Sequence, residues 1–183
     1  MKNFMIVCAA MLLLFASAGC GGDTSTENKS AEKSDENLIG QWSRIEKDSS
    51  GVVTAITILN IETEKSATLK TLTLVASKFS ENEPVQIFWQ TGDIQADINR
   101  SGKTLKFVAH EMNDVELLEL NYDGQNLSSD KMTFTKENLD VENLKAQSIS
   151  QYQANIGEKS EVIADMTQAE YKDYINQKVF GIR

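Results

Sequence analysis

Residues 85–110, VQIFWQTGDIQADINRSGKTLKFVAH, decide the fold class of this chain. Apolar side chains occupy alternate positions in three stretches, at Val85, Ile87 and Trp89, at Ile94, Ala96 and Ile98, and at Leu105, Phe107 and Ala109. A period of two is typical of antiparallel strands with one face toward a core and one toward water. Residues 91–93 and 100–103 contain the glycine and small polar residues of tight turns. This segment therefore predicts a meander of short strands.

The alternation continues on both sides of this segment. Residues 118–122 alternate in the same way, the series ends at Phe134, and residues 49–51 and 123–125 supply further turns. Counting the segments gives about eight strands in residues 38–136. We therefore expect a mainly β domain there, an antiparallel meander that closes into a small barrel or folds into a sandwich.

Two stretches depart from simple alternation. Residues 52–62 are apolar on both faces, which indicates a more deeply buried strand. Leu69 is out of phase with Leu72 and Leu74, as a β-bulge near residues 70–71 would produce.

Beyond Lys136 the apolar period becomes helical, which predicts a helical C-terminal part in residues 137–183. A first apolar face consists of Val141, Leu144, Ile149 and Tyr152, and Gly157 supplies a helix stop. Residues 167–170 match a capping box at the start of a second helix. Its stripe consists of Tyr171, Tyr174, Ile175, Lys178 and Val179. We expect both helices to pack on the sheet. A partner-binding role for Tyr171 and Tyr174 is the alternative.

The N-terminus has the composition of a secretory signal. Lys2 precedes an apolar run at residues 4–15, and the small residues Ala-Ser-Ala-Gly-Cys follow at 16–20. The run is about half the roughly 20 apolar residues that a transmembrane helix needs. We therefore expect residues 1–19 to be removed rather than to span a membrane.

Residues 17–20 resemble the lipobox of bacterial lipoproteins in their last three positions, Ala18, Gly19 and Cys20; Ser17 departs from the usual Leu. The resemblance implies cleavage between Gly19 and Cys20 and acyl chains on Cys20, which would anchor the protein stably. An ordinary signal ending at Ala18 is the alternative, and it would leave Cys20 as a free thiol.

Residues 20–37 are expected to form the lipidated end and a flexible tether, because residues 21–37 contain no aliphatic or aromatic residue larger than Ala31. The exported chain would carry 17 basic and 27 acidic residues, since Lys2 is the one basic residue lost from 18, and its charge would be −10. Such a charge repels nucleic acid. The other cysteine, Cys8, lies in the signal, so no disulfide is expected. We expect the extracytoplasmic side of a bacterial envelope, with Gly21 favouring the outer membrane where one exists.

Gly40 and Trp42 form a Gly-x-Trp at the first strand. They resemble the motif that opens the barrel of lipocalins, in which the glycine lets the chain bend and the tryptophan plugs one end. The resemblance implies a lipocalin-like barrel with an external C-terminal helix, closure roles for Gly40 and Trp42, and stacking of Lys136 or Arg44 on the indole. A buried core tryptophan in another β fold is the alternative.

The sequence offers little for catalysis. His110 is the one histidine, at the end of an alternating strand, and the mature chain retains no cysteine except Cys20. Zinc needs three or four nitrogen or sulfur ligands, and neither a calcium loop nor a phosphate loop is present. We therefore expect no enzyme, cofactor or metal.

Two functional classes remain. The first is a protein-interaction or envelope-maintenance module with an envelope protein as its partner. The second is a lipocalin-like carrier of a small apolar ligand. Eight-stranded barrels are just wide enough for side chains to fill, so the interaction module is preferred.

Overall fold

The computed structural model describes residues 37–110, 112 and 115–181. The signal, the Gly19–Cys20 cleavage position and the tether as far as residue 36 lie outside the described residues. Eight strands come first along the described chain: β1 (Gly40–Lys47), β2 (Val53–Thr63), β3 (Ser66–Ser77), β4 (Val85–Ser101), β5 (Thr104–Ala109), β6 (Glu116–Tyr122), β7 (Asn126–Ser128) and β8 (Thr133–Lys136). They are followed by α1 (Val141–Ile156), β9 (Ser160–Val162), β10 (Met166–Thr167) and α2 (Gln168–Phe180).

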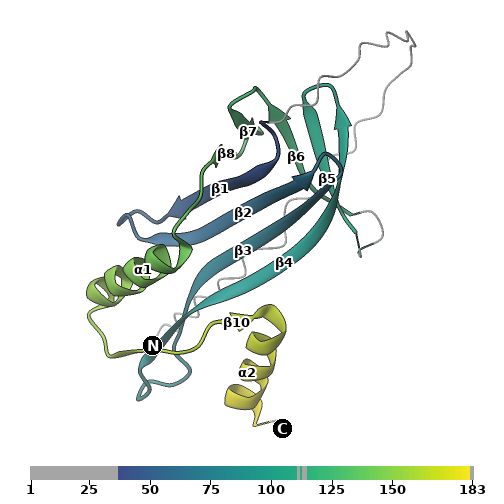
Figure 1. The fold of residues 1–183 in the computed structure, drawn as a ribbon. Coiled ribbons are helices and arrows are strands. Elements are labelled where there is room, and N and C mark those ends of the chain that lie inside the picture. Colours follow the sequence, from purple (N-terminus) through teal and green to yellow (C-terminus); the bar gives the residue numbers. More distant parts are fainter. Residues whose placement is uncertain (1–36, 111, 113–114, 182–183) are drawn as a thin grey trace. The chain divides into compact units, whose positions relative to one another are not determined.

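The eight strands close into an antiparallel barrel (Figure 1). Each strand pairs with the next, and β8 returns to β1 with Lys136 opposite Trp42. Closure removes the free edges that an open sheet would present. The prediction of a mainly β, lipocalin-like barrel followed by helices is confirmed, and the sandwich alternative is excluded.

The predicted turn at residues 91–93 is wrong. β4 runs without a break from Val85 to Ser101, and Gly92 pairs with Thr71 in the middle of it. The predicted bulge near residues 70–71 is also wrong, because β3 keeps one register with β4 from Ser66 to Ser77.

A change of buried face explains both errors. The barrel-core cluster, inside the barrel, takes Leu59 from β2, Leu69 from β3 and Ala96 from β4. A second cluster, here the α1 cluster, takes Ile56, Leu72 and Trp89 from the opposite face of the same strands. The apolar phase therefore switches along each strand without a bulge or a turn.

The switch lies at the same level in neighbouring strands because Thr57, Thr71 and Gly92 are register partners. Beyond this row β3 and β4 continue past the strands that close the barrel, and β4 is buried on both faces. Its Trp89 lies in the α1 cluster, and its Phe88 packs on the other face against Tyr171 of α2, with ring centroids 5.2 Å apart. Alternation with Ile87 and Trp89 predicts Phe88 on the solvent face, and the packing of α2 buries it instead.

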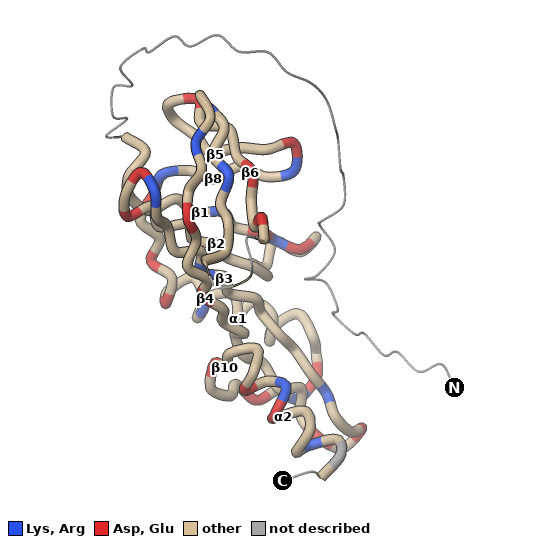
Figure 2. The backbone as a smooth tube through the Cα atoms, turned by 90° about the vertical axis from the view of Figure 1, so that its right-hand side faces the viewer, with Lys and Arg blue, Asp and Glu red and all other residues tan. Residues whose placement is uncertain are grey.

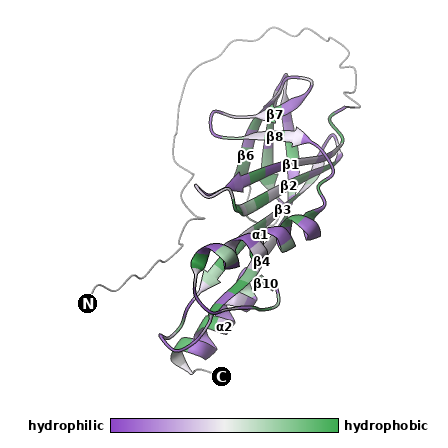
Figure 3. Cartoon of the chain, turned by 90° about the vertical axis from the view of Figure 1, so that its left-hand side faces the viewer, coloured by the Kyte–Doolittle hydropathy of each residue, from purple (hydrophilic) through white to green (hydrophobic). Residues whose placement is uncertain are grey.

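α1 ends and α2 begins where the sequence predicts. Asp140 caps α1 by accepting the Asn143 amide, and Gly157 ends it with a φ of 63°. Val141, Leu144 and Ile149 of α1 pack on the α1 cluster, and α2 starts at the predicted capping box. Hydrophilic residues are frequent along both helices, and charges of both signs are interspersed over the described chain (Figures 2 and 3). Through its apolar contacts α1 covers one face of the sheet, and α2 covers the opposite face of β4 through Tyr171.

We expect residues 37–183 to fold alone as a soluble, β-rich monomer, because one unit of this chain, residues 35–183, contains the whole barrel and its helices. The fragment should unfold cooperatively in a thermal or denaturant titration without added reductant, metal or lipid. A circular dichroism spectrum dominated by helix, or unfolding on addition of a chelator, would contradict this expectation.

Candidate functional site

Trp42, near the start of β1, is buried in the barrel core. The Trp42 side chain is 1% exposed, and its Nε1 donates to the Leu38 carbonyl at 2.8 Å. The Tyr122 ring meets it edge-on at 5.8 Å, and the Lys136 ammonium lies 5.6 Å from its centroid. Of the two basic residues that the lipocalin resemblance offered, Lys136 therefore takes the stacking position. Trp42 is a core residue and not an exposed contact.

Gly40 supplies an unusual backbone conformation next to Trp42. Its φ of 126° is one that side chains disfavour, and a Cβ there would lie 3.2 Å from Cε of Lys136. The Lys136 ammonium also donates to the Asn37 carbonyl at 2.5 Å, which fixes the chain where it enters the barrel. Arg44 instead pairs with Glu46 at 2.5 Å.

Side chains fill the barrel interior. The barrel-core cluster has members from all eight strands, each at most 8% exposed: Leu38, Trp42, Leu59, Ile61, Ala67, Leu69, Ala96, Ile98, Leu105, Phe107, Leu120, Tyr122, Leu127 and Phe134. Leu117, Leu118 and Met132 pack against it. An interior occupied in this way acts as a core.

The two tyrosines of α2 point to the sheet. The Tyr171 hydroxyl lies 3.1 Å from the Ser77 hydroxyl, and the Tyr174 hydroxyl donates to the side chain of Gln86. At the start of the helix, the amide and hydroxyl of Thr167 donate to Glu170 and hold the pKa of that carboxyl below its ordinary value. The tyrosines proposed as partner contacts therefore attach α2 to β3 and β4.

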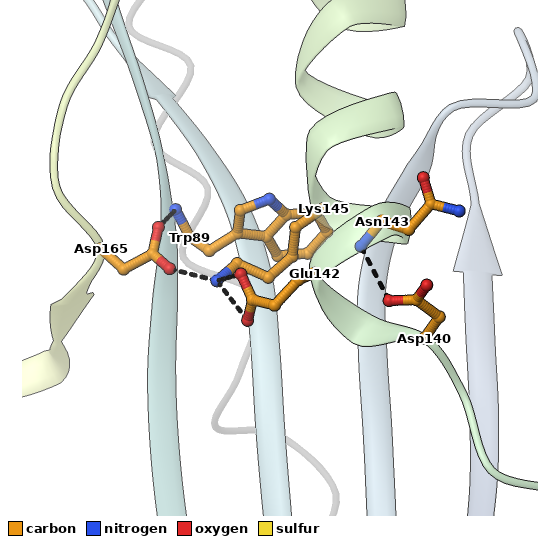
Figure 4. Close-up of polar contacts among 6 residues, drawn as sticks. All are labelled: Trp89, Asp140, Glu142, Asn143, Lys145 and Asp165. Carbon is orange, nitrogen blue, oxygen red and sulfur yellow. Dashed lines mark hydrogen bonds and ion pairs between the residues drawn. The ribbon is translucent and has the colours of Figure 1, made fainter.

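A polar latch joins α1 to β4 (Figure 4). Asp165, between β9 and β10, accepts the Trp89 backbone amide at 3.2 Å and the Lys145 ammonium at 2.5 Å. Glu142 binds the same ammonium at 3.1 Å. β9 and β10 pair with β4 on either side of Trp89. The Trp89 backbone amide lies between these two pairings, and the Asp165 carboxylate accepts its hydrogen bond.

The two carboxylates that bind Lys145 differ in their exposure to solvent, and the more buried one should bind it more strongly. Partial burial by itself lowers the pKa of Lys145, but Asp165 and Glu142 outweigh this effect and raise that pKa above its ordinary value. The Lys145 side chain is 13% exposed and that of Asp165 35%, whereas that of Glu142 is 82% exposed. Asp165 should therefore contribute most of the stabilisation.

We expect Asp165→Ala to lower the free energy of unfolding by about 1–3 kcal/mol, because it leaves the Trp89 amide and the Lys145 ammonium without this acceptor. Glu142→Ala is the matched control, since it removes the exposed partner of the same lysine and should cost less than about 0.5 kcal/mol. Denaturant titration measures both. Equal losses for the two variants would contradict the assignment of Asp165 as the latch.

The outer wall of the barrel carries an open depression of about 510 Å³, lined by Gln41, Ile58, Asn60, Thr68, Lys70, Asp93 and Gln95. The sheet register explains why these residues meet. One row across β1 to β4 is Gln41, Asn60, Thr68 and Gln95, and the next is Ser43, Ile58, Lys70 and Asp93. The depression thus consists of seven of the eight positions in two adjacent cross-strand rows.

Several polar groups in this depression are unused. The side chains of Asn60, Lys70 and Asp93 make no hydrogen bond or ion pair to any other residue that the structure describes. The Thr68 hydroxyl lies 2.8 Å from the Glu62 carboxylate and 3.1 Å from the Gln95 side-chain oxygen, and Gln41 donates to the Glu137 carbonyl at 3.3 Å. Ile58, only 8% exposed, also belongs to the α1 cluster.

The remaining candidate is His110. Its Nδ1 lies 2.9 Å from the Asp97 carboxylate, and its side chain is 67% exposed, as expected for a histidine at the barrel rim. Within the described ranges, no group of three or more His, Cys, Asp or Glu residues is placed to hold a metal ion. Neither described helix is long and apolar enough to cross a bilayer.

The depression has no signal in the sequence, because its polar residues alternate along their strands like an ordinary solvent face. Only the register between β1 and β4 brings them together. Comparison with protein-family models, with curated proteins and with solved structures gave no significant match.

Proposed function

We propose that this chain is a non-catalytic interaction module, held at the bacterial cell envelope by a lipid on Cys20 and recognising an envelope protein with its outer surface. The observation that carries the proposal is the filled barrel interior. Because side chains from all eight strands occupy it, the outer wall and the two helices are the surfaces left for a partner.

The N-terminal sequence supports the anchoring part of the proposal. Ala18, Gly19 and Cys20 fit the lipobox, and the polar residues that follow suit a tether. The acidic charge of the chain gives no electrostatic attraction to anionic head groups, so a covalent lipid is the natural means of attachment.

The carrier alternative is less well supported. A small apolar ligand would need space next to Leu59, Leu105 and Phe107, and these side chains are at most 1% exposed in the barrel core. Binding there would require repacking a close-packed core, which is costly.

Site-specific photocrosslinking in living cells tests the proposal. A photoreactive amino acid is placed at three exposed positions, Lys172 on α2, Gln151 on α1 and Gln125 in the turn before β7. We expect one discrete protein adduct from one of these surfaces, and we expect Cys20→Ser to remove it because the variant is no longer held near its partner. The absence of a discrete adduct from all three positions, or an adduct that persists in the Cys20→Ser variant, would contradict the proposal.

A further inference from the structure

We propose that the outer-wall depression between β1 and β4 binds a short, uncharged stretch of glycan. The inference does not require the protein partner proposed above, because it rests on the depression alone. Six of its seven lining side chains are polar, and its two charged groups, Lys70 and Asp93, have opposite signs and sum to zero. A neutral ligand therefore fits its charge best.

The unused groups offer both donors and acceptors. Lys70 supplies an ammonium, Asp93 a carboxylate, and Asn60 an amide that both donates and accepts. Lys70 and Asp93 are register partners across β3 and β4, yet they form no ion pair in the described structure. A hydroxyl group can donate to the carboxylate and accept from the ammonium, so neighbouring sugar hydroxyls match this pair.

The dimensions also suit a short saccharide. Strands in a sheet lie about 4.8 Å apart, so a row from β1 to β4 extends about 15 Å, and two rows on one face lie about 7 Å apart. This is about the area that a trisaccharide covers when it lies flat. Ile58 gives the floor an apolar surface for the C–H groups of a sugar ring.

Other ligand classes fit less well. An extended peptide normally adds to a sheet edge, and the main-chain groups beneath this depression are already paired between β1, β2, β3 and β4. An anionic ligand would meet one ammonium and one carboxylate on a chain of net charge −9. An apolar ligand would leave the polar groups of six of the seven lining side chains without hydrogen-bond partners.

Nuclear magnetic resonance titration tests the inference. The ¹⁵N-labelled full-length chain in detergent is titrated separately with chitotriose, cellotriose and maltotriose. A parallel titration with an uncharged extended peptide tests the alternative class of ligand. We expect at least one trisaccharide to cause saturable shifts at residues 58–60, 68–70 and 93–95, with a dissociation constant in the millimolar range, as befits an open site without an aromatic platform.

Two variants decide whether the depression is responsible. Asp93→Asn and Asn60→Ala should each weaken binding by about tenfold, since the first replaces a carboxylate acceptor with an amide donor and the second removes an amide that bonds the ligand. Gln125→Ala, in an exposed turn, should leave affinity unchanged, and well-dispersed spectra show that each variant is folded. No saturable shift with any trisaccharide, shifts confined elsewhere, shifts that neither variant reduces, or binding of the peptide alone would overturn the inference. None of these outcomes would contradict the proposed protein partner, which the crosslinking experiment tests separately.

Discussion

Replacing Trp42 with Ala is expected to lower the free energy of unfolding by about 3–5 kcal/mol, a large share of a typical total of roughly 5–15 kcal/mol. The indole is 1% exposed, and its contacts tie the ends of the barrel domain together: Leu38 before β1, Tyr122 of β6 and Lys136 of β8. Its removal leaves a cavity where the barrel closes, without an acceptor for the Lys136 cation–π contact. Denaturant titration measures the loss.

Two variants sharpen this prediction. Trp42→Phe keeps an aromatic ring but loses the Nε1 donor to Leu38. Its free energy of unfolding should therefore lie between the values for wild type and Trp42→Ala. Ile39→Ala truncates the neighbouring side chain, which is 43% exposed, and should cost less than about 0.5 kcal/mol. If Trp42→Ala also cost less than about 0.5 kcal/mol, the closure role of the indole would be wrong.

Replacing Cys20 with Ser should abolish lipid attachment and release the protein from the membrane fraction. A lipobox acylates its cysteine sulfur, and no other thiol remains in the sequence after residue 19. Metabolic labelling with an alkyne fatty acid, followed by membrane fractionation, measures both effects.

Cys8→Ser is the matched control for this experiment. Cys8 lies in the segment that cleavage before Cys20 would remove, so this variant should label and fractionate as wild type does. A Cys20→Ser protein that still labelled and remained with membranes would show that the anchor lies elsewhere. An unlabelled wild type would favour an ordinary signal that ends at Ala18.

The sequence predicted antiparallel strands, about eight in number, but it divided β4 in two and did not separate β7 from its neighbours. A period of two reports which face of a strand is buried, and it assumes that this face does not change. In β4 the buried face changes at Gly92, where the barrel core ends and the covering by α1 begins. From the sequence this phase change looked like a turn, and in β3 it looked like a bulge. Only the packing of α1 on the sheet distinguishes a change of buried face from a turn or a bulge.

The same limit applies to the candidate sites. The lipocalin resemblance implies that Lys136 or Arg44 stacks on Trp42, and the structure selects Lys136, whose ammonium lies 5.6 Å from the ring centroid. Asn60 and Asp93 carry no motif and lie on β2 and β4, so their proximity depends on the register of β3 between them. Asp165 was missed for the same reason, since its partners lie on β4 and α1.

Recognition of partners through the outer surface requires that the barrel interior be a core. Native mass spectrometry of the chain, purified gently from its own host, tests whether the interior is a core or holds a ligand. We expect the mass of the polypeptide with its covalent lipid and no apolar compound bound in addition. A one-to-one apolar compound that dissociates on unfolding, and that Leu59→Trp excludes from the folded protein, would contradict the claim and establish a ligand carrier.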